Sequence, residues 1–267
     1  MGVIIVTGAT GAIGGAAVQM LRQRGHEVIG TSRRPDSQGW YTLDVSRPDS
    51  IVAFVQKLTE EGIRLDGLLN NAGTLQREYH VTPDGFELVT ATNYLGTYLL
   101  TRKLLPMMNE GAHVVCTASL SCYVARLGKD FFDLSADNYR QIKAYSNSKM
   151  ALVYFAQELH RRYGKHLHVN LTDPGIVNSR MIHLDRWFDS LADIAFRQRL
   201  AAFRGLGAEV PVDVVHVPDH HGRLAVHLAG GALLGGIFAF VNVTADRADP
   251  FLHNQFLLIL PLIADFI

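Results

Sequence analysis

The feature that most constrains the fold is a glycine-rich segment near the start of the chain. Residues 3–6 read VIIV, a β-branched run that predicts a buried strand, and TGATGAIGG then leads into a helical pattern through Leu21. Glycines in such a turn allow the backbone to approach a pyrophosphate closely, and the helix start offers free N–H groups to it. The segment predicts a dinucleotide-binding turn, because a plain strand-to-helix turn would hardly need Gly8, Gly11 and Gly14 together.

The rest of the first two-thirds alternates strand and helix. This alternation predicts an α/β fold: a Rossmann-type doubly wound parallel sheet with helices on both faces, in a single domain. We expect Asp49 or Ser50 to be the N-cap of the second helix. Beyond the first strand and helix, the pattern predicts strands at 26–30, 65–69, 112–118 and 168–171, and helices at 49–61, 86–108 and 149–163.

Composition excludes several classes of protein. Apolar residues make up 48% of the 267 residues and charged residues 19%, which favours a sizeable core over disorder. The formal net charge is zero, so the basic field of a nucleic-acid binder is absent. Two cysteines imply no disulfide framework, and no secretory signal is visible, so we expect a cytoplasmic protein.

The last third of the chain is irregular. We expect a single domain over residues 1–267, with the Rossmann core in 1–180 and a substrate lid plus an atypical C-terminal region in 181–267. An apolar stretch at 224–243 is interrupted by Arg, His and glycines, which favours a buried strand and packing segment over a membrane span. Weak association of the apolar tail with a membrane surface stays possible.

The end of the second strand bears on the choice of nucleotide. NAD enzymes usually place an acidic residue there for the ribose hydroxyls, but this chain has Ser32, Arg33 and Arg34. Guanidinium groups suit a 2′-phosphate through charge and forked hydrogen bonds. The sequence therefore predicts NADP(H) as the cofactor, and the alternative is that the arginines are only solvated loop residues.

An ordered set of motifs resembles the short-chain dehydrogenase/reductase family, closest to its retinol-dehydrogenase-like branch. The segment DGFELVTATNYLGTYLLTRKLLPMM resembles that branch, as does the long gap of 26 positions between Ser119 and Tyr145. The motifs are TGATGAIG, LDV at 43–45, NNAG at 70–73, NYLG at 93–96, Ser119, YSNSK at 145–149 and DPGIV at 173–177.

The chain departs from that family in two places. Most members have a glycine where this chain has Ala12, and the spacing of Gly8, Gly11 and Gly14 looks more like the longer, epimerase-type branch. Residues from about 205 onward do not align with the usual final helix and strand of the retinol-like branch. Because substrate contacts in the family come partly from that region, the substrate is the least determined feature.

The resemblance implies four catalytic residues. Tyr145 would exchange a proton with the substrate oxygen, and Lys149, one helical turn later, would lower the proton affinity of that phenol. Ser119 would polarise the same oxygen, with Ser121 as the less favoured candidate. Asn93 would hold a water that links Lys149 to solvent, or would be only a buried amide.

Further residues are expected to hold the cofactor. Asn70 and Asn71 are expected to bond backbone and fix the sheet, and HVPDHH at 216–221 is interpreted as loop histidines, so no metal is expected. The predicted cofactor contacts are Gly8, Thr10, Gly11, Ala12, Ile13, Gly14, Ser32, Arg33, Arg34, Asp44, Val45, Asn71, Ala72, Gly73, Tyr145, Lys149, Pro174, Gly175, Val177 and Ser179.

The resulting hypothesis is an NADP(H)-dependent oxidoreductase that interconverts an alcohol with a ketone or aldehyde. The resemblance suggests a lipophilic substrate such as a retinoid, a steroid or another apolar carbonyl compound. It also implies a homodimer or homotetramer. Two alternatives remain: an NADP(H)-binding protein without turnover, suggested by the irregular C-terminus, and an epimerase or dehydratase on a nucleotide sugar, suggested by the glycine spacing.

Overall fold

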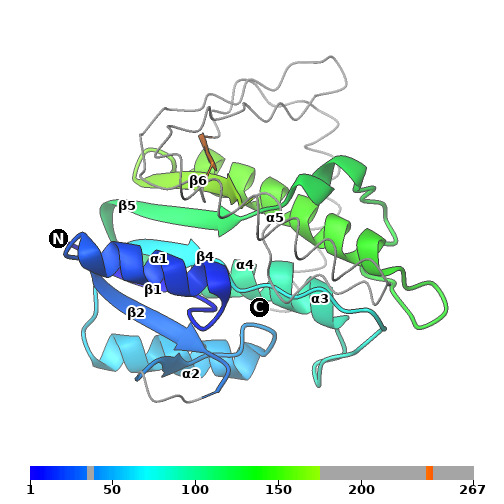
Figure 1. Cartoon of the computed structure of the whole chain (residues 1–267), viewed down its shortest axis with the longest axis horizontal. Coiled ribbons are helices and arrows are strands. Elements are labelled where there is room, and N and C mark those ends of the chain that lie inside the picture. The colour runs from blue at the N-terminus through cyan, green and yellow to red at the C-terminus, as the bar shows by residue number, and fades with distance from the viewer. Residues whose placement is uncertain (35–38, 175–238, 243–267) are drawn as a thin grey trace, which may run out of the picture.

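A twisted, mostly parallel sheet forms the centre of the computed structural model, which describes residues 1–34, 39–174 and 239–242 (Figure 1). The strand order is β3-β2-β1-β4-β5-β6-β7, with the first six strands parallel and β7 antiparallel to β6. The predicted doubly wound parallel sheet is confirmed. The strands are β1 (Val3–Val6), β2 (Glu27–Ser32), β3 (Tyr41–Thr42), β4 (Leu65–Asn70), β5 (Met108–Thr117), β6 (Leu167–Asp173) and β7 (Ala239–Asn242).

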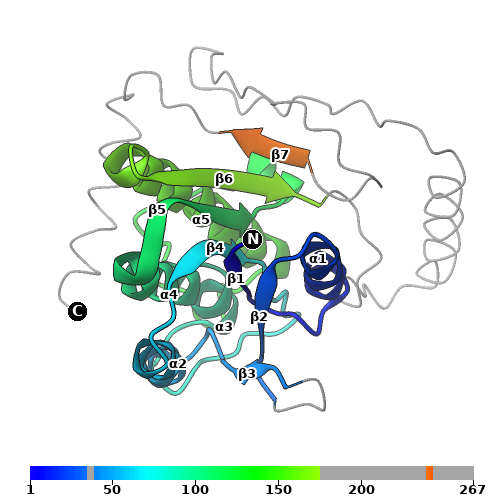
Figure 2. The ribbon, with the colours of Figure 1, turned by 90° about the vertical axis from the view of Figure 1, so that its left-hand side faces the viewer.

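The described helices lie on both faces of the sheet (Figure 2). Helix α1 (Ala12–Gln23) covers one face, and α2 (Pro48–Glu60), α4 (Gly96–Leu104) and α5 (Gln141–Tyr163) cover the other. The chain runs outward from β1 to β3 and then returns to add β4 on the opposite side of β1. The strand order therefore reverses between β1 and β4, and ligands of such sheets bind at this switch point, beyond the carboxyl ends of the strands.

The larger core lies between the sheet and the three-helix face. Ile5, Leu68 and Val114 project from adjacent strands into one cluster of buried side chains, which includes Leu100 of α4 and Leu152 of α5. Each fully buried aliphatic side chain of this kind contributes about 1.5–3 kcal/mol. The core thereby fixes α4 and α5, which carry two of the predicted catalytic segments, to the sheet.

The predicted helix at 49–61 is confirmed, with each end displaced by one residue, but the prediction that Asp49 or Ser50 is its N-cap was wrong. The helix begins at Pro48, with Arg47 as N-cap and no side-chain cap. Ser50 is unavailable for capping because its Oγ accepts a hydrogen bond from the Asp44 backbone N–H at 2.9 Å.

The predicted long helix at 86–108 is a series of shorter pieces. Glu87 caps the first piece, α3 (Leu88–Thr90), by accepting hydrogen bonds from the backbone N–H groups of Val89 and Thr90, each at 2.7 Å. A π-helical turn (Ala91–Leu95) joins α3 to α4, and a 3-10 turn (Leu105–Met107) containing Pro106 ends the series. The helix predicted at 149–163 begins earlier, at Gln141, so Tyr145 and Lys149 both lie inside it.

Predictions for the C-terminal region fall largely outside the described residues. The predicted substrate lid, the apolar tail and the HVPDHH segment at 216–221 lie there. Strand β7 lies within the apolar stretch at 224–243, where the sequence predicts a strand. None of the helices in the described part of the chain is long and apolar enough to span a bilayer.

Candidate active site

The glycine turn at the end of β1 forms a narrow cradle. Gly8 has φ +67°, a left-handed conformation that favours glycine, and its carbonyl oxygen accepts a hydrogen bond from the Gly11 N–H at 3.0 Å. A Cβ on Gly14 would lie 2.2 Å from that same oxygen. Gly11 is the N-cap of α1 and provides no side-chain cap, and Thr10, Gly11 and Ala12 are exposed. Backbone N–H groups at an exposed helix start fit a pyrophosphate, so the residues present fit the predicted dinucleotide.

Asn71 joins the ends of β1 and β4 at the switch point. Its side-chain Nδ2 donates to the Thr7 carbonyl at 2.9 Å, and its backbone N–H donates to Thr7 Oγ1 at 2.9 Å. Ala72 N–H donates to the same hydroxyl. The predicted backbone role of Asn71 is confirmed. The prediction that Asn70 also bonds backbone was wrong, because its side chain donates to the side-chain hydroxyl of Thr101 in α4 at 3.0 Å.

The residues predicted to choose the nucleotide lie at the end of β2. Ser32 is buried and its Oγ accepts the Arg34 N–H at 3.3 Å, whereas Arg33 and Arg34 are exposed. Asp44 follows β3, and its carboxylate accepts hydrogen bonds from the N–H and the hydroxyl of Ser46. Val45 packs its carbonyl against Gly96 of α4, where a Cβ would lie 1.6 Å from that oxygen. The predicted nucleotide contacts Ser32 and Asp44 therefore lie at or just beyond the carboxyl ends of β2 and β3, which are neighbouring parallel strands.

Asn93 is a fully buried amide in the π-helical turn before α4. Its Oδ1 accepts the Thr74 N–H at 2.7 Å, and its Nδ2 donates to the Thr74 carbonyl at 2.9 Å and to Ser148 Oγ at 3.0 Å. Ser148 in turn donates to the Tyr145 carbonyl at 2.7 Å. Asn93 therefore fixes the loop after β4 to the catalytic helix α5. Sequence reasoning missed Ser148, although its place in YSNSK, one residue before Lys149, was a usable signal.

Gly73 brings the loop after β4 into contact with two predicted catalytic groups. A Cβ on Gly73 would lie 3.3 Å from Asn93 Oδ1 and 3.5 Å from Lys149 Nζ. The predicted cofactor contact Gly73 therefore lies beside two of the predicted catalytic residues, with its α-carbon facing both side chains.

Tyr145 and Ser119 come together from α5 and the end of β5. Ser119 Oγ lies close enough to the Tyr145 hydroxyl to affect its pKa, and it accepts the Ser121 N–H at 3.2 Å. This geometry favours Ser119 over Ser121 as the partner of the phenol, because Ser121 Oγ is buried without a hydrogen-bond partner. Burial raises the pKa of Tyr145, and the neighbouring Ser119 hydroxyl lowers it in part.

Lys149 lies one turn beyond Tyr145 and is almost fully buried, with a relative exposure of 4%. Its Nζ donates to the Thr117 carbonyl at 2.7 Å and lies 5.8 Å from the centre of the Tyr145 ring. Desolvation by burial lowers the pKa of Lys149 to about 8. The sequence predicts that Lys149 lowers the proton affinity of Tyr145. In the described geometry burial of the phenol outweighs any such effect, since the ammonium is directed to a backbone carbonyl.

This pKa shift makes the stability of the protein depend on pH. The folded chain releases the Lys149 proton near pH 8, whereas the unfolded chain holds it up to about 10.5. The unfolded state therefore binds more protons between these values, so stability rises with pH. Relative to Lys149→Met, the wild-type free energy of unfolding should increase by roughly 1–3 kcal/mol between pH 7.5 and 10. Urea unfolding at several pH values measures this difference, with Lys165→Met as the exposed-lysine control, and a flat difference contradicts it.

The residues predicted after β6 are only partly described. Pro174 follows Asp173 at the carboxyl end of β6, next to the end of β5, whereas Gly175, Val177 and Ser179 lie outside the described residues. Thr117, which receives the Lys149 hydrogen bond through its backbone, was not among the predicted site residues. A backbone acceptor leaves no signal in the sequence, because every residue type provides it.

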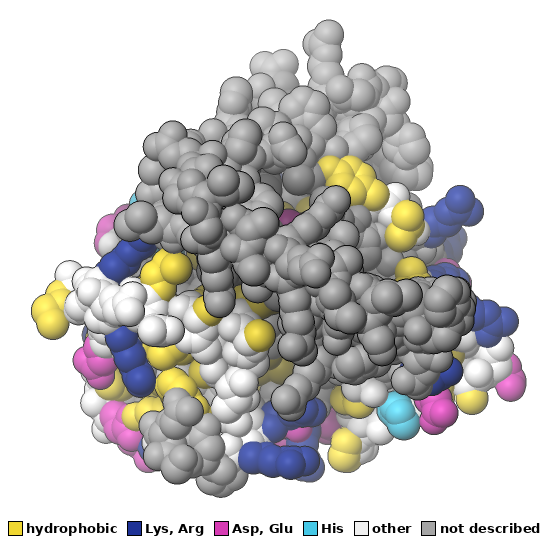
Figure 3. Space-filling model, in the orientation of Figure 1, with side chains coloured by type: hydrophobic (Ala, Val, Ile, Leu, Met, Phe, Trp, Pro, Cys, Tyr) yellow, Lys and Arg dark blue, Asp and Glu magenta, His cyan; other side chains and the backbone are white. Residues whose placement is uncertain are grey.

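The described residues show no other catalytic or metal chemistry. They contain no group of three His, Cys, Asp or Glu side chains placed to hold a metal ion. Cys116 and Cys122 are buried free thiols, and burial raises the pKa of Cys122 to about 11, so it is a poor nucleophile. On the face shown in Figure 3, Lys and Arg side chains are interspersed with Asp and Glu around the rim.

Comparison with known proteins identifies relatives of the chain. The family described as short chain dehydrogenase matches residues 2–186. Polyprenol dehydrogenase of Homo sapiens is 35% identical over 215 residues, which cover 71% of this chain and 65% of that protein. Retinol dehydrogenase 14 of Homo sapiens is 39% identical over 150 residues, covering 53% of this chain and 44% of that protein. The chain thus spans between about half and two-thirds of the length of these two relatives.

Solved structures agree with this relationship. The crystal structure of an uncharacterized protein from Mycobacterium paratuberculosis is similar with a TM-score of 0.60 and 29% identity, covering 76% of each chain. Structures that share the fold have been solved with NADH and with NADP bound. The fold alone therefore does not choose between the two nucleotides.

Proposed function

Because the chain belongs to the short-chain dehydrogenase family, in its retinol-dehydrogenase-like branch, we propose that it is an NADP(H)-dependent oxidoreductase that interconverts an alcohol with a ketone or aldehyde. The observation that carries this proposal is that the Ser119 hydroxyl lies beside the Tyr145 phenol, with Lys149 one turn later on the same helix. A phenol and a hydroxyl that face one site can both bond a single substrate oxygen.

Each catalytic residue has a distinct part in the proposed reaction. Tyr145 protonates the carbonyl oxygen during reduction and accepts the hydroxyl proton during oxidation. Ser119 donates a hydrogen bond to the same oxygen and stabilises the charge that develops there. Asn93 holds the loop after β4 against α5 through Ser148, which also bonds the Tyr145 carbonyl. Lys149 holds α5 to the end of β5 through the Thr117 carbonyl. When bound, the nicotinamide supplies or accepts the hydride, and its oxidised form adds a positive charge that favours the tyrosinate.

The preference for NADP(H) rests on Arg33 and Arg34. Both guanidinium groups are exposed just beyond β2, next to a buried serine, and the described residues place no carboxylate in β2 after Glu27. An exposed guanidinium pair can bind a 2′-phosphate bidentately.

Removing these two charges should therefore weaken NADPH selectively. We expect the Arg33→Ala/Arg34→Ala variant to raise the dissociation constant for NADPH by about 10–100-fold and to change that for NADH less than about threefold. Fluorescence titration of both nucleotides measures this. Arg24→Ala, which removes an exposed arginine at the end of α1, is the control. An equal loss for both nucleotides contradicts the assignment.

We propose a lipophilic substrate, such as a retinoid, a steroid or another apolar carbonyl compound. Its support is the names of the relatives, retinol and polyprenol dehydrogenases, and the exposed apolar side chains of Tyr123 and Val124, which follow Ser119. The deciding experiment is NADPH oxidation by the purified protein across a panel of apolar ketones and aldehydes. Turnover supports the proposal, and nucleotide binding without turnover of any member favours a binding protein instead.

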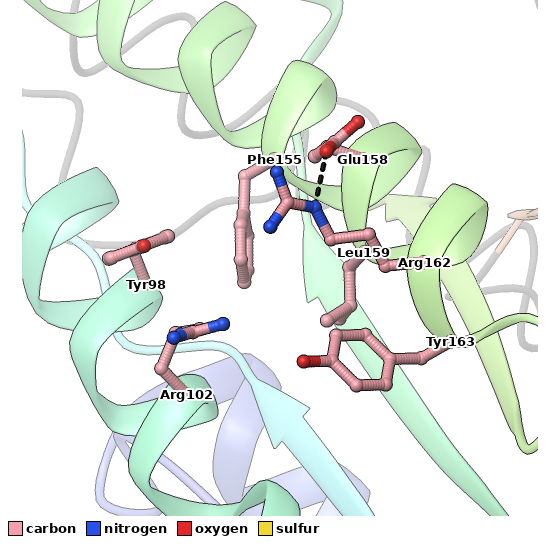
Figure 4. Close-up of a pocket in the computed structure, with 7 residues that line it drawn as sticks. All are labelled: Tyr98, Arg102, Phe155, Glu158, Leu159, Arg162 and Tyr163. Atoms are coloured by element: carbon pink, nitrogen blue, oxygen red, sulfur yellow. Dashed lines mark hydrogen bonds and ion pairs between the residues drawn. The ribbon is translucent and has the colours of Figure 1, made fainter. Parts of the chain in front are cut away.

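We also propose a cytoplasmic homodimer or homotetramer that associates through α4 and α5. Support comes from a shallow hollow between these helices (Figure 4), where Tyr98 and Phe155 make an edge-to-face contact with ring centroids 5.3 Å apart. Light scattering on the purified protein measures the molar mass, and a monomer at micromolar concentration overturns the proposal. The hollow is lined by Tyr98, Arg102, Phe155, Glu158, Leu159, Arg162 and Tyr163.

A further inference from the structure

The segment between β5 and α5, residues 120–140, is held to the rest of the protein at its outer end. Tyr139 donates its hydroxyl to the Gln76 carbonyl at 2.7 Å, and Tyr79 donates its hydroxyl to the Leu134 carbonyl at 2.9 Å. The two tyrosine rings also contact each other edge to face, with centroids 6.0 Å apart. These contacts fasten the segment to the loop that follows NNAG.

The inner part of this segment is held by Asn147. The Asn147 side chain accepts the Arg126 N–H at 2.8 Å and donates to the Arg126 carbonyl at 3.0 Å, so it satisfies both backbone groups of one residue. Asn147 itself is buried, with a relative exposure of 5%. It stands on α5 two residues after Tyr145 and two before Lys149, so the clamp joins the segment directly to the catalytic helix.

Residues 119–126 are therefore fixed at both ends beside the reacting groups. Ser119 at one end lies beside the Tyr145 hydroxyl, and the backbone of Arg126 at the other end is hydrogen-bonded to the Asn147 side chain. A short 3-10 turn (Leu120–Val124) connects them. Tyr123 and Val124 in this turn are exposed by 46% and 67%, so two adjacent apolar side chains are accessible a few residues after Ser119.

We propose that Asn147 is a positioning residue that fixes residues 119–126 as a preformed wall of the substrate site, and that Tyr123 and Val124 on this wall favour large apolar carbonyl substrates over small ones. The inference rests on the proposed oxidoreductase function. The wall is preformed because Asn147 binds both backbone groups of Arg126 without any substrate present, so binding does not have to order this end of the wall. A large apolar substrate gains by covering the exposed side chains, whereas a small one reaches only the catalytic pair.

The kinetic test compares Asn147→Ala with Asn138→Ala. Asn138 makes the same kind of backbone clamp within the segment, to Ser135 N–H at 2.8 Å and the Asp133 carbonyl at 2.9 Å, but it is exposed at the outer end. With Asn147→Ala we expect KM for a large apolar ketone to rise by about tenfold or more, and KM for a small ketone to change less than about threefold. Asn138→Ala should leave both unchanged. Equal losses for large and small ketones overturn the proposal.

A second variant keeps the test valid if Asn147→Ala does not fold. Val124→Ser changes only an exposed side chain of the wall, and it should lower kcat/KM for the large ketone by about tenfold while sparing the small one. If kcat/KM for the large ketone is unchanged in this variant, Val124 does not contact the substrate. That result overturns the proposal that the wall favours large substrates.

Limited proteolysis tests the anchoring independently of activity. Besides Arg140 at its end, the segment carries two trypsin sites close to the Asn147 clamp, Arg126 and Lys129. Cleavage there should be about fivefold or more faster in Asn147→Ala than in wild type or Asn138→Ala, because local opening of the segment becomes easier. Equal cleavage rates overturn the anchoring role even if no carbonyl substrate is turned over. Faster cleavage without turnover of any carbonyl instead supports the anchor and overturns the proposed function.

Discussion

Replacing Tyr145 with Phe is expected to lower turnover by roughly 10²–10⁴-fold while leaving the affinity for NADPH within about twofold. The phenol lies beside the Ser119 hydroxyl, just past the end of β5, and it is the proposed proton donor to the substrate oxygen. Phe preserves the ring and its burial, so the fold and the cofactor cradle around Gly8 and Gly14 should be unaffected. Steady-state NADPH oxidation and nucleotide titration on the same preparation separate the two effects.

Tyr123→Phe provides the matched control. Tyr123 is also a tyrosine close to Ser119, in the 3-10 turn that follows it, but its side chain is half exposed and the proposed mechanism gives its hydroxyl no proton-transfer role. We expect this variant to keep its turnover number within about threefold. Comparable losses in both tyrosine variants contradict a unique role for Tyr145.

The fold was predictable because its signals are local. Each β-branched run, each helical pattern and the glycine turn spans only a short stretch of the chain, and together they predicted the sheet and every described strand except β3. β3 was missed because two residues cannot show a periodicity. The N-cap of α2 was wrongly predicted because Ser50 is engaged by Asp44, a contact that no local rule anticipates.

The site was predictable as a set of residue types but not as a set of interactions. The motifs placed Asn93, Ser119, Tyr145 and Lys149 in one site, and the structure brings them together. The pKa direction of Tyr145 depends on how deeply the phenol is buried and on where the Lys149 ammonium points, which are properties of packing. The Asn147 clamp joins residues 21 positions apart through a backbone partner, so the side chain of Arg126 gives no hint of it.

The second large effect is expected from Gly14→Ala. The added Cβ would lie 2.2 Å from the Gly8 carbonyl oxygen and 2.8 Å from Asn71 Nδ2, and real carbon atoms do not approach that closely. Either α1 moves away from the turn or Asn71 loses its bond to Thr7, so the turn between β1 and α1 must open. We expect the free energy of unfolding to fall by about 1–3 kcal/mol and the affinity for NADPH to fall by at least about tenfold.

Gly15→Ala is the control for this variant, because it adds the same methyl group one residue later in the same helix. Its Cβ would lie 3.3 Å from the Ala9 carbonyl oxygen, a contact that a small backbone adjustment can relieve. Alanine is also favoured over glycine inside a helix by about 1 kcal/mol, so this variant should be at least as stable as wild type. Urea unfolding and NADPH titration of both variants test the cradle. If Gly14→Ala binds NADPH as tightly as Gly15→Ala does, the close approach of α1 to the Gly8 carbonyl is not what forms the nucleotide site.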